Sequence, residues 1–401
     1  MAYLQAFLAI LFWVSVFFIL YTYIGYPLLI SLIARFIPFP IEQSGAPDLS
    51  VTILITAYNE ETVIEKKIEN SLGLDYPRDK LQIIVAADGS SDRTPEIVRK
   101  FSDRGVELTF TPQRGGKMAA INRAIPYSSG EIIIFSDANN MYDQDTIRKL
   151  IDPFSDQTVG ATTGAKLIIQ DGTELSSTEG IYWKYESWIK ANETILGTCT
   201  SSAGEILAIR RELYIPPPNN IINDDYYIVT DLIKRGFRVI YVPQARSFEY
   251  ISANARDEMV RRSRMNAGKY QAIFMSYRLL PFDRPVLLWQ IISHKYFRAF
   301  LPFGFLGVLV ANILLVLLHR DIPLSLLRVS MPYAWVFLLM QSLFYLLAAL
   351  GNYVKFSGLL GKLVYLPTYL VNSNLAILRG FHGFVTGKQT NIWDRVQRDH
   401  I

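Results

Sequence analysis

Cysteine is nearly absent from this sequence, because Cys199 stands alone among 401 residues. A chain with one cysteine cannot form an internal disulfide, so its fold need not mature in an oxidising compartment. A strong net charge is also absent. The formal net charge is +4, which suits anionic substrates and an anionic lipid surface and gives no reason to expect a nucleic-acid partner.

Charge is missing altogether from several long apolar runs. No residue from Met1 to Ala34 is charged, and this run exceeds the roughly 20 residues that cross a bilayer. The start also lacks a basic segment and a small-residue cleavage site, which favours an uncleaved anchor over a secretory signal. Residues 299–318 and 329–354 are equally free of charge and long enough to span. Residues 363–378 are fewer and contain proline and asparagine, so this segment either spans or re-enters.

These runs predict five segments along the chain. They are a transmembrane anchor over 1–36, a linker over 37–50, a globular domain over 51–283, an amphipathic interfacial helix over 284–298 and a transmembrane region over 299–401. The last region would hold two clear spans and a third that spans or re-enters. The distribution of Lys and Arg favours a cytoplasmic globular domain, so we expect an integral protein of the plasma (inner) membrane.

Predicted strands and helices alternate at the start of the globular domain. Apolar runs at Val51–Ala57, Leu81–Ala87, Val106–Thr111 and Glu131–Phe135 predict four strands, each followed by a predicted helix. This alternation is typical of a mostly parallel sheet covered on both faces. We therefore expect an α/β, Rossmann-like nucleotide-binding fold. The second half is more mixed, with helices predicted over 174–195, 225–234 and 255–274 and strands over 206–209 and 237–242.

Polar residues follow the first two predicted strands. Ala57-Tyr58-Asn59-Glu60 ends the first strand, and Asp88-Gly89-Ser90-Ser91-Asp92 ends the second. Polar groups at the carboxyl ends of adjacent parallel strands meet in the crevice of the sheet. Asp88 could there accept hydrogen bonds from a nucleobase or a ribose. An Asp-Gly turn followed by a helix cap explains the same residues without a ligand.

Two further segments suit a diphosphate and a cation. Gln113-Arg114-Gly115-Gly116-Lys117 leads into a predicted helix, where the glycines permit close approach and the helix start attracts phosphate; its spacing is not that of a Walker loop. Asp137-Ala138-Asn139 can offer two oxygen ligands to Mg²⁺ or Mn²⁺. The alternatives are a solvated basic loop and a turn capped by Asp or Asn.

A second acidic pair and a group of arginines follow. Asp224 and Asp225 open a predicted helix, where capping is one explanation. A catalytic base must be ionised and within reach of a hydroxyl, and one of this pair qualifies if the helix start faces the crevice. Arg261, Arg262 and Arg264 share a predicted helix. They either solvate its surface or stabilise a leaving diphosphate.

In this order the motifs resemble those of the membrane-integrated family 2 glycosyltransferases, which include hyaluronan, cellulose and poly-N-acetylglucosamine synthases. The resemblance covers Val51 to Arg298 in motif order, together with the anchor, domain and anchor layout of the chain. It implies a GT-A glycosyltransferase domain inserted between transmembrane helices, a UDP-sugar donor, and Mg²⁺ or Mn²⁺ as cofactor.

The resemblance also implies roles for individual residues. Asn223-Asp224-Asp225 looks like the Thr-Glu-Asp motif, which makes Asp225 the candidate base, and Arg261 to Met265 occupies the Gln-x-x-Arg-Trp position. The expected catalytic residues are Asp225, Asp224 and Arg264. The expected nucleotide-sugar-binding residues are Ala57, Tyr58, Glu60, Asp88, Lys117, Asp137 and Arg261. The expected metal ligands are Asp137 and Asn139, and the expected acceptor-side residues are Gly204, Glu205 and Met265.

Three residues depart from the family pattern. Asn139 replaces the second Asp of the metal motif and so removes a negative charge. Arg261 replaces Gln. Met265 replaces a Trp whose indole faces the acceptor sugar, and its thioether can pack against a sugar or a lipid without supplying an aromatic platform.

The two enzymatic hypotheses differ in the molecule that accepts the sugar. We expect an inverting enzyme that transfers sugar to a growing extracellular polysaccharide by single displacement, as the overall layout favours. The small number of spans and Met265 favour the alternative, transfer of one sugar to a membrane lipid or a polyprenyl phosphate. A membrane scaffold with a degenerate fold is a third hypothesis, against which the intact Asp88, Asp137 and Asp225 argue.

Overall fold

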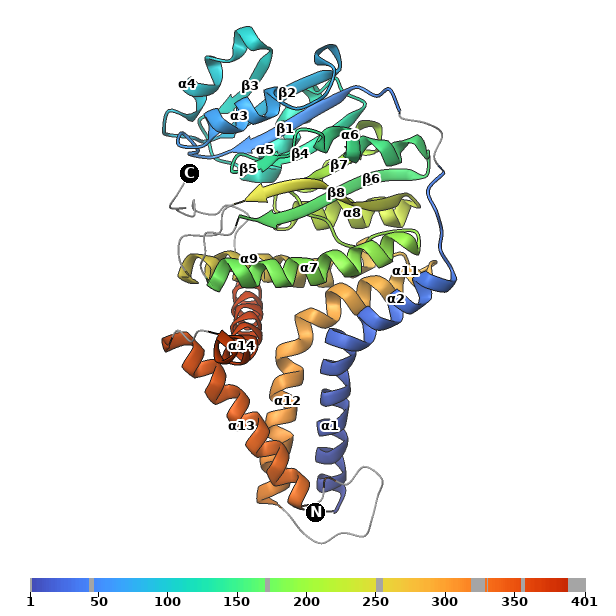
Figure 1. The fold of residues 1–401 in the computed structure, drawn as a ribbon, viewed down its shortest axis with the longest axis vertical. Coiled ribbons are helices and arrows are strands. Elements are labelled where there is room, and N and C mark those ends of the chain that lie inside the picture. The colour runs from blue at the N-terminus through green and yellow to red at the C-terminus, as the bar shows by residue number, and fades with distance from the viewer. Residues whose placement is uncertain are drawn as a thin grey trace. The chain divides into compact units, whose positions relative to one another are not determined.

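The structure is a computed structural model that describes residues 2–42, 47–169, 174–249, 255–318, 329, 331–354 and 358–388. The chain divides into two compact units (Figure 1). One comprises residues 29–258 and 271–291 and contains the α/β domain. The other comprises residues 1–28, 259–270 and 292–388 and is helical. Residues 389–401 of the expected transmembrane region and residues 43–46 of the expected linker lie outside the described residues.

The described strands of the α/β domain form one eight-stranded sheet in the order β3-β2-β1-β4-β7-β6-β8-β5. Their bounds are β1 Val51–Ala57, β2 Leu81–Asp88, β3 Val106–Thr111, β4 Ile132–Asp137, β5 Asn140–Tyr142, β6 Val159–Ile168, β7 Leu207–Arg210 and β8 Arg238–Glu249. β1 to β4 pair in parallel, and β6 pairs in parallel with β8. β7 is antiparallel to β4 and β6, and β5 is antiparallel to β8. The predicted α/β fold is confirmed, although the sheet is mixed rather than mostly parallel beyond β4.

The strands at the centre of the sheet are buried along most of their length. Val51, Ile53 and Ile134 have no exposed surface, as expected where helices cover both faces of parallel strands. Ile64 and Ile68 of one covering helix join them in the core. The helices of this domain are α3 Ile64–Leu72, α4 Thr94–Arg99, α5 Lys117–Ala124, α6 Thr146–Ile151, α7 Glu174–Ile195 and α8 Asp224–Arg235, followed by α10 Ser276–Leu279 and α11 Pro285–Ile291.

The direction of β7 decides where the loop before it lies. β4 and β7 are antiparallel, with Phe135 paired to Leu207. The residues that precede β7 therefore lie at the same edge of the sheet as the residues that follow β4. Hydrogen bonds confirm this arrangement, because Tyr142 donates its hydroxyl and Asn140 its amide to the carbonyl of Glu205, at 2.6 and 3.0 Å. Two segments far apart in the sequence thus lie at the same edge of the sheet.

The described residues include three candidate membrane helices. They are Tyr3–Phe36, Pro285–Leu317 and Pro332–Tyr353, long and apolar enough to cross a membrane, and they indicate a membrane protein. The remaining helical elements are α1 Ala2–Leu20, the π-helical turn η1 Tyr21–Gly25, α2 Tyr26–Phe36, α9 Ala255–Phe274, the π-helical turn η7 Ile292–Tyr296, α12 Phe297–Leu317, α13 Met331–Tyr353 and α14 Gly358–Val385.

Two expectations for this part of the chain concern helix boundaries. Residues 285–317 are helical throughout, with the π-helical turn at Ile292–Tyr296 inside the expected interfacial helix of residues 284–298. α14 is an unbroken helix that contains Pro367 and is not among the candidate spans within the described residues. Whether it crosses or re-enters the membrane stays a prediction, as does the cytoplasmic side of the sheet domain.

Candidate active site

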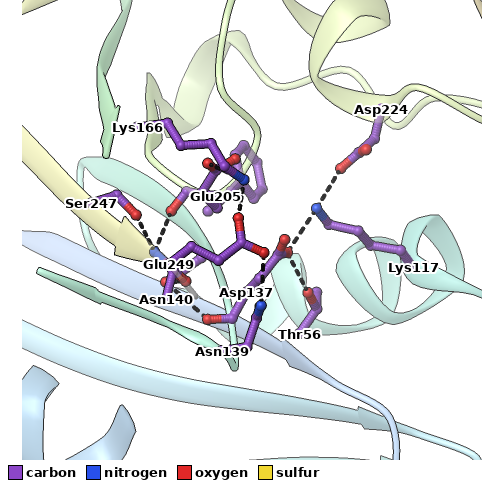
Figure 2. A network of polar contacts seen from close by, with 12 residues as sticks. Thr56, Lys117, Asp137, Asn139, Asn140, Lys166, Glu205, Asp224, Ser247 and Glu249 are labelled. Atoms are coloured by element: carbon purple, nitrogen blue, oxygen red, sulfur yellow. Dashed lines mark hydrogen bonds and ion pairs between the residues drawn. The ribbon is translucent and has the colours of Figure 1, made fainter. Parts of the chain in front are cut away.

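One lysine joins two of the predicted carboxylates. Lys117 Nζ lies 2.9 Å from Asp137 Oδ1 and 3.3 Å from Asp224 Oδ2, as Figure 2 shows. Burial lowers the pKa of Lys117, but Asp137 and then Asp224 raise it more, so the net pKa lies above its usual value. Burial raises the pKa of Asp137, and Lys117 more than offsets this and holds it below its usual range. The lysine is therefore a fixed positive charge between the end of β4 and the start of α8.

The loop before α5 places this lysine. Gly116 has a φ of +90°, in the left-handed region that favours glycine, and it turns the chain into α5. Asp88 accepts hydrogen bonds from the backbone N–H groups of Gly115 and Gly116, at 3.0 and 2.7 Å from its Oδ2. Its side chain is buried, so here its carboxylate organises the loop, and its predicted contact with the nucleotide stays a prediction.

The segments after β1 and β2 meet at the same edge, as the sequence predicts. The N–H of Asn59 donates to Ser90 Oγ at 3.1 Å, and the N–H of Glu60 donates to Thr94 Oγ1 at 2.8 Å. The guanidinium of Arg114 lies 3.5 Å from the ring centroid of Tyr58. Ala57 is buried at the end of β1. The structure thus gathers the predicted donor-side segments.

The candidate base lies beside this cluster. Asp225 is the second residue of α8 and accepts a hydrogen bond from Ser202 Oγ, 3.1 Å from its Oδ2. Burial, followed by the charge of Asp224, raises the pKa of Asp225 to about 6, while Lys117 acts in the opposite direction. A Cβ added to Gly204 would lie 3.1 Å from Asp225 Cβ. The predicted acceptor-side glycine is therefore in contact with the predicted base.

A buried ion-pair cluster that the sequence did not reveal adjoins Asp137. Lys166 Nζ lies 3.2 Å from Glu205 Oε1 and also pairs with Glu249. Glu249 Oε1 accepts a hydrogen bond from Asn139 Nδ2 at 2.9 Å. β6, which carries Lys166, was not predicted, and β8 was expected to end before Glu249. A lysine within an apolar strand is the signal that could have pointed to a buried partner. The acceptor-side role of Glu205 stays a prediction.

Asp137 and Asn139 could bind a divalent cation together with the diphosphate of a nucleotide-sugar donor. Asp137 keeps 39% of its side chain exposed, and Asn139 can add an amide oxygen. The described part of the chain contains no group of three or more His, Cys, Asp and Glu residues that could hold a metal. Mg²⁺ usually binds one or two carboxylates together with substrate phosphates. Asp137 and Asn139 therefore fit a cation shared with a diphosphate rather than one caged by protein alone.

The arginine motif lies on a helix of the other unit. Arg261, Arg264 and Met265 belong to the part of α9 that groups with the apolar helices. Met265 is 41% exposed. Arg262 Nη1 donates to Ser373 Oγ of α14 at 3.1 Å. The roles expected of Arg261, Arg264 and Met265 toward donor and acceptor stay predictions.

Comparisons with known proteins agree with this fold. Residues 52–215 match the family model described as Glycosyl transferase family 2. The poly-beta-1,6-N-acetyl-D-glucosamine synthase of Staphylococcus aureus is 27% identical over 264 residues, which cover 62% of this chain and 64% of that protein. The probable glycosyltransferase YdaM of Bacillus subtilis is 27% identical over 299 residues, 69% of this chain and 68% of that protein.

A solved structure shares the fold over nearly the whole chain. The mannosyltransferase PcManGT from Pyrobaculum calidifontis, determined with GDP-mannose and Mn²⁺, has a TM-score of 0.70 and 22% identity, and the match covers 96% of this chain and 99% of that one. This likeness confirms a GT-A-like sheet flanked by long apolar helices. The family model spans Lys117, Asp137 and Gly204 and ends before Asp224. Residues 52–215 therefore match glycosyl transferase family 2, and the chain is similar to the two glycosyltransferases named above.

Proposed function

We propose that this protein is an inverting glycosyltransferase that moves a sugar from a UDP-sugar to a growing extracellular polysaccharide in a single displacement. The observation that carries the proposal is the arrangement of Asp225, a partly buried carboxylate with a raised pKa, beside the ammonium group of Lys117 that bridges Asp137 and Asp224. A base and a cation are the two groups that such a displacement needs.

The proposed displacement follows from the charges of Asp225 and Lys117. Asp225, ionised above about pH 6, removes the proton of the acceptor hydroxyl, and that oxygen attacks the anomeric carbon as the bond to the diphosphate breaks. Lys117, and Arg264 in the role expected of it, offset the negative charge that develops on the leaving UDP. Attack opposite the leaving group converts an α-linked donor into a β-linked product. Mg²⁺ or Mn²⁺, held by Asp137 and Asn139, would add charge compensation at the diphosphate.

The choice between the two candidate acceptors rests on similarity to known proteins and on Met265. The S. aureus relative is a polysaccharide synthase by its description, and this favours a polymer and makes UDP-N-acetylglucosamine the first donor to test. Met265, exposed where an aromatic platform was expected, favours a second candidate, transfer of one sugar to a membrane lipid or polyprenyl phosphate.

The test is a donor panel with purified full-length protein in lipid nanodiscs. Radiolabelled UDP-sugars and GDP-mannose are supplied with Mg²⁺ or Mn²⁺, and lipid products are separated from polymer. We expect a UDP-sugar to be turned over and label to enter polymer. Label in a lipid-linked monosaccharide would select the second candidate, and no release of nucleotide from any donor would contradict an enzymatic role.

Asp225→Asn tests the base assignment. It should lower transfer at least about a hundredfold, the order of a lost general base, with UDP affinity nearly unchanged. Asp231→Asn is the matched control, because Asp231 lies on the same helix and pairs with Arg235 at the surface. Turnover by Asp225→Asn equal to that of Asp231→Asn would refute the role of Asp225.

A further inference from the structure

The loop before β7 contacts one particular oxygen of the candidate base. Ser202 Oγ donates a hydrogen bond to Asp225 Oδ2 at 3.1 Å. On the same side, a Cβ added to Gly204 would lie 3.7 Å from Oδ2. Oδ2 therefore faces the loop formed by residues 202–204.

We propose that Ser202 is a positioning residue that holds Oδ2 of Asp225 and so leaves Oδ1 to take the proton of the acceptor hydroxyl. This inference rests on the proposed function and goes beyond it by naming the reacting oxygen and the residue that orients it. Ser202 itself touches neither the sugar nor the nucleotide in this scheme.

The loop that carries Ser202 is itself held at several points. The N–H of Ala203 donates to Thr163 Oγ1 of β6 at 3.0 Å. The carbonyl of Glu205 accepts hydrogen bonds from Asn140 and Tyr142, and the N–H of Gly164 donates to the carbonyl of Ile206 at 3.0 Å. A support fixed in this way can keep a catalytic side chain in one orientation.

The groups around Asp225 fix the sign of the expected pH effect. Burial, and after it the charge of Asp224, raises the pKa of Asp225, whereas Lys117, the backbone N–H of Tyr226 and the Ser202 hydroxyl lower it. A hydrogen bond donated to the charged form favours that form. Loss of the Ser202 hydroxyl therefore raises the pKa of Asp225 and leaves more of the base protonated near pH 6.

The experiment compares Ser202→Ala with Ser202→Thr, using the UDP-sugar that the donor panel identifies and UDP-N-acetylglucosamine first. Full-length protein in nanodiscs is assayed for kcat and KM across the pH range. For Ser202→Ala we expect kcat near pH 6 to fall about tenfold, the acid limb to move up by about one pH unit, and KM for the donor to stay unchanged. Ser202→Thr, which retains the hydroxyl, should restore both kcat and the acid limb.

Ser201→Ala is the matched control. Ser201 is the adjacent serine, and its Oγ donates to Glu186 at 3.4 Å rather than to Asp225. Three results would each overturn the positioning role. The first is that Ser202→Ala has the same kinetics as Ser201→Ala, and the second is that Ser202→Ala and Ser202→Thr lose kcat equally. The third is that Ser202→Ala no longer binds UDP. The proposed function fails by different results, namely an inactive wild type or an active Asp225→Asn.

Discussion

Replacing Lys117 by Met should destabilise the sheet domain more than any exposed lysine would. The change keeps an unbranched side chain and removes the charge between Asp137 and Asp224. The lysine side chain is 13% exposed, and that of Asp224 is 15% exposed. Both carboxylates would then lack the cation that they share at present.

The structure sets the size of the effect. Removing one partner of a buried ion pair costs about 3–5 kcal/mol. Since 39% of the Asp137 side chain is exposed and water screens its charge, we take the lower end, about 3 kcal/mol. For a domain of about 150–250 residues, each kcal/mol lowers Tm by about 2–4 °C. The expected fall in Tm is therefore about 6–12 °C, measured by tryptophan fluorescence of the full chain in nanodiscs at about pH 8, without nucleotide.

The pH dependence distinguishes electrostatics from lost packing. The lowered pKa of Asp137 contributes stability above its unfolded value near 3.9, and this stability is lost as pH falls through the folded pKa. Lys117→Met lacks that contribution. The difference in Tm between wild type and variant should thus be fully present near pH 8 and should narrow as the pH falls below about 4.

Lys149→Met is the matched control. Lys149 pairs with Asp145 four residues earlier, and their side chains are 33% and 51% exposed, so the change should cost less than about 1 kcal/mol. An equal fall in Tm for the two variants, or a difference that grows as the pH falls, would refute the reasoning.

Three further predictions concern the site. The value of kcat should decline on the acid side with a midpoint near pH 6, because Asp225 must be ionised; a flat profile through that pH would contradict it. Gly204→Ala places a Cβ 3.1 Å from Asp225 Cβ, so kcat should fall while UDP affinity is retained. In the control Gly73→Ala, the added Cβ would lie 3.4 Å from the Glu69 carbonyl oxygen, and both kcat and UDP affinity should stay unchanged. Asn139→Asp adds a carboxylate opposite Glu249, so Tm without metal should fall and should recover with Mn²⁺ and UDP, as melting curves would show; an unchanged Tm would count against the hydrogen bond.

The first half of the fold could be predicted because its strands are continuous apolar runs. Val51–Ala57 and Val106–Thr111 are predicted and observed with the same bounds. β6 was missed because Val159–Ile168 contains two glycines, two threonines and a lysine, which is not the continuous apolar run of a buried strand. Its extended conformation is decided by burial within the sheet and not by its composition. β8 was expected to stop at Val242, but it continues through Pro243 to Glu249, where pairing with β5 and β6 extends it.

The candidate site was predictable where each residue lies at the end of its own element. Asp137 follows the core of a strand and Asp224 opens a helix, so their position relative to the crevice follows from topology alone. Lys166 and Glu249 could not be found in this way. They lie within strands, and their pairing appears once β6 and β8 are side by side.

The position of β7 has a consequence for synthesis of the chain. β4 and β6 both leave the ribosome before β7, and each pairs with β7 in the finished sheet. Until residues 207–210 arrive, β6 has no strand to pair with, because its other partner β8 follows β7 in the chain. The edge of β4 and both edges of β6 then have unpaired backbone groups, which are sites for aggregation. Because Ser202 and Gly204 lie in the loop directly before β7, they reach the edge of the sheet beside Asp225 only when β7 pairs with β4.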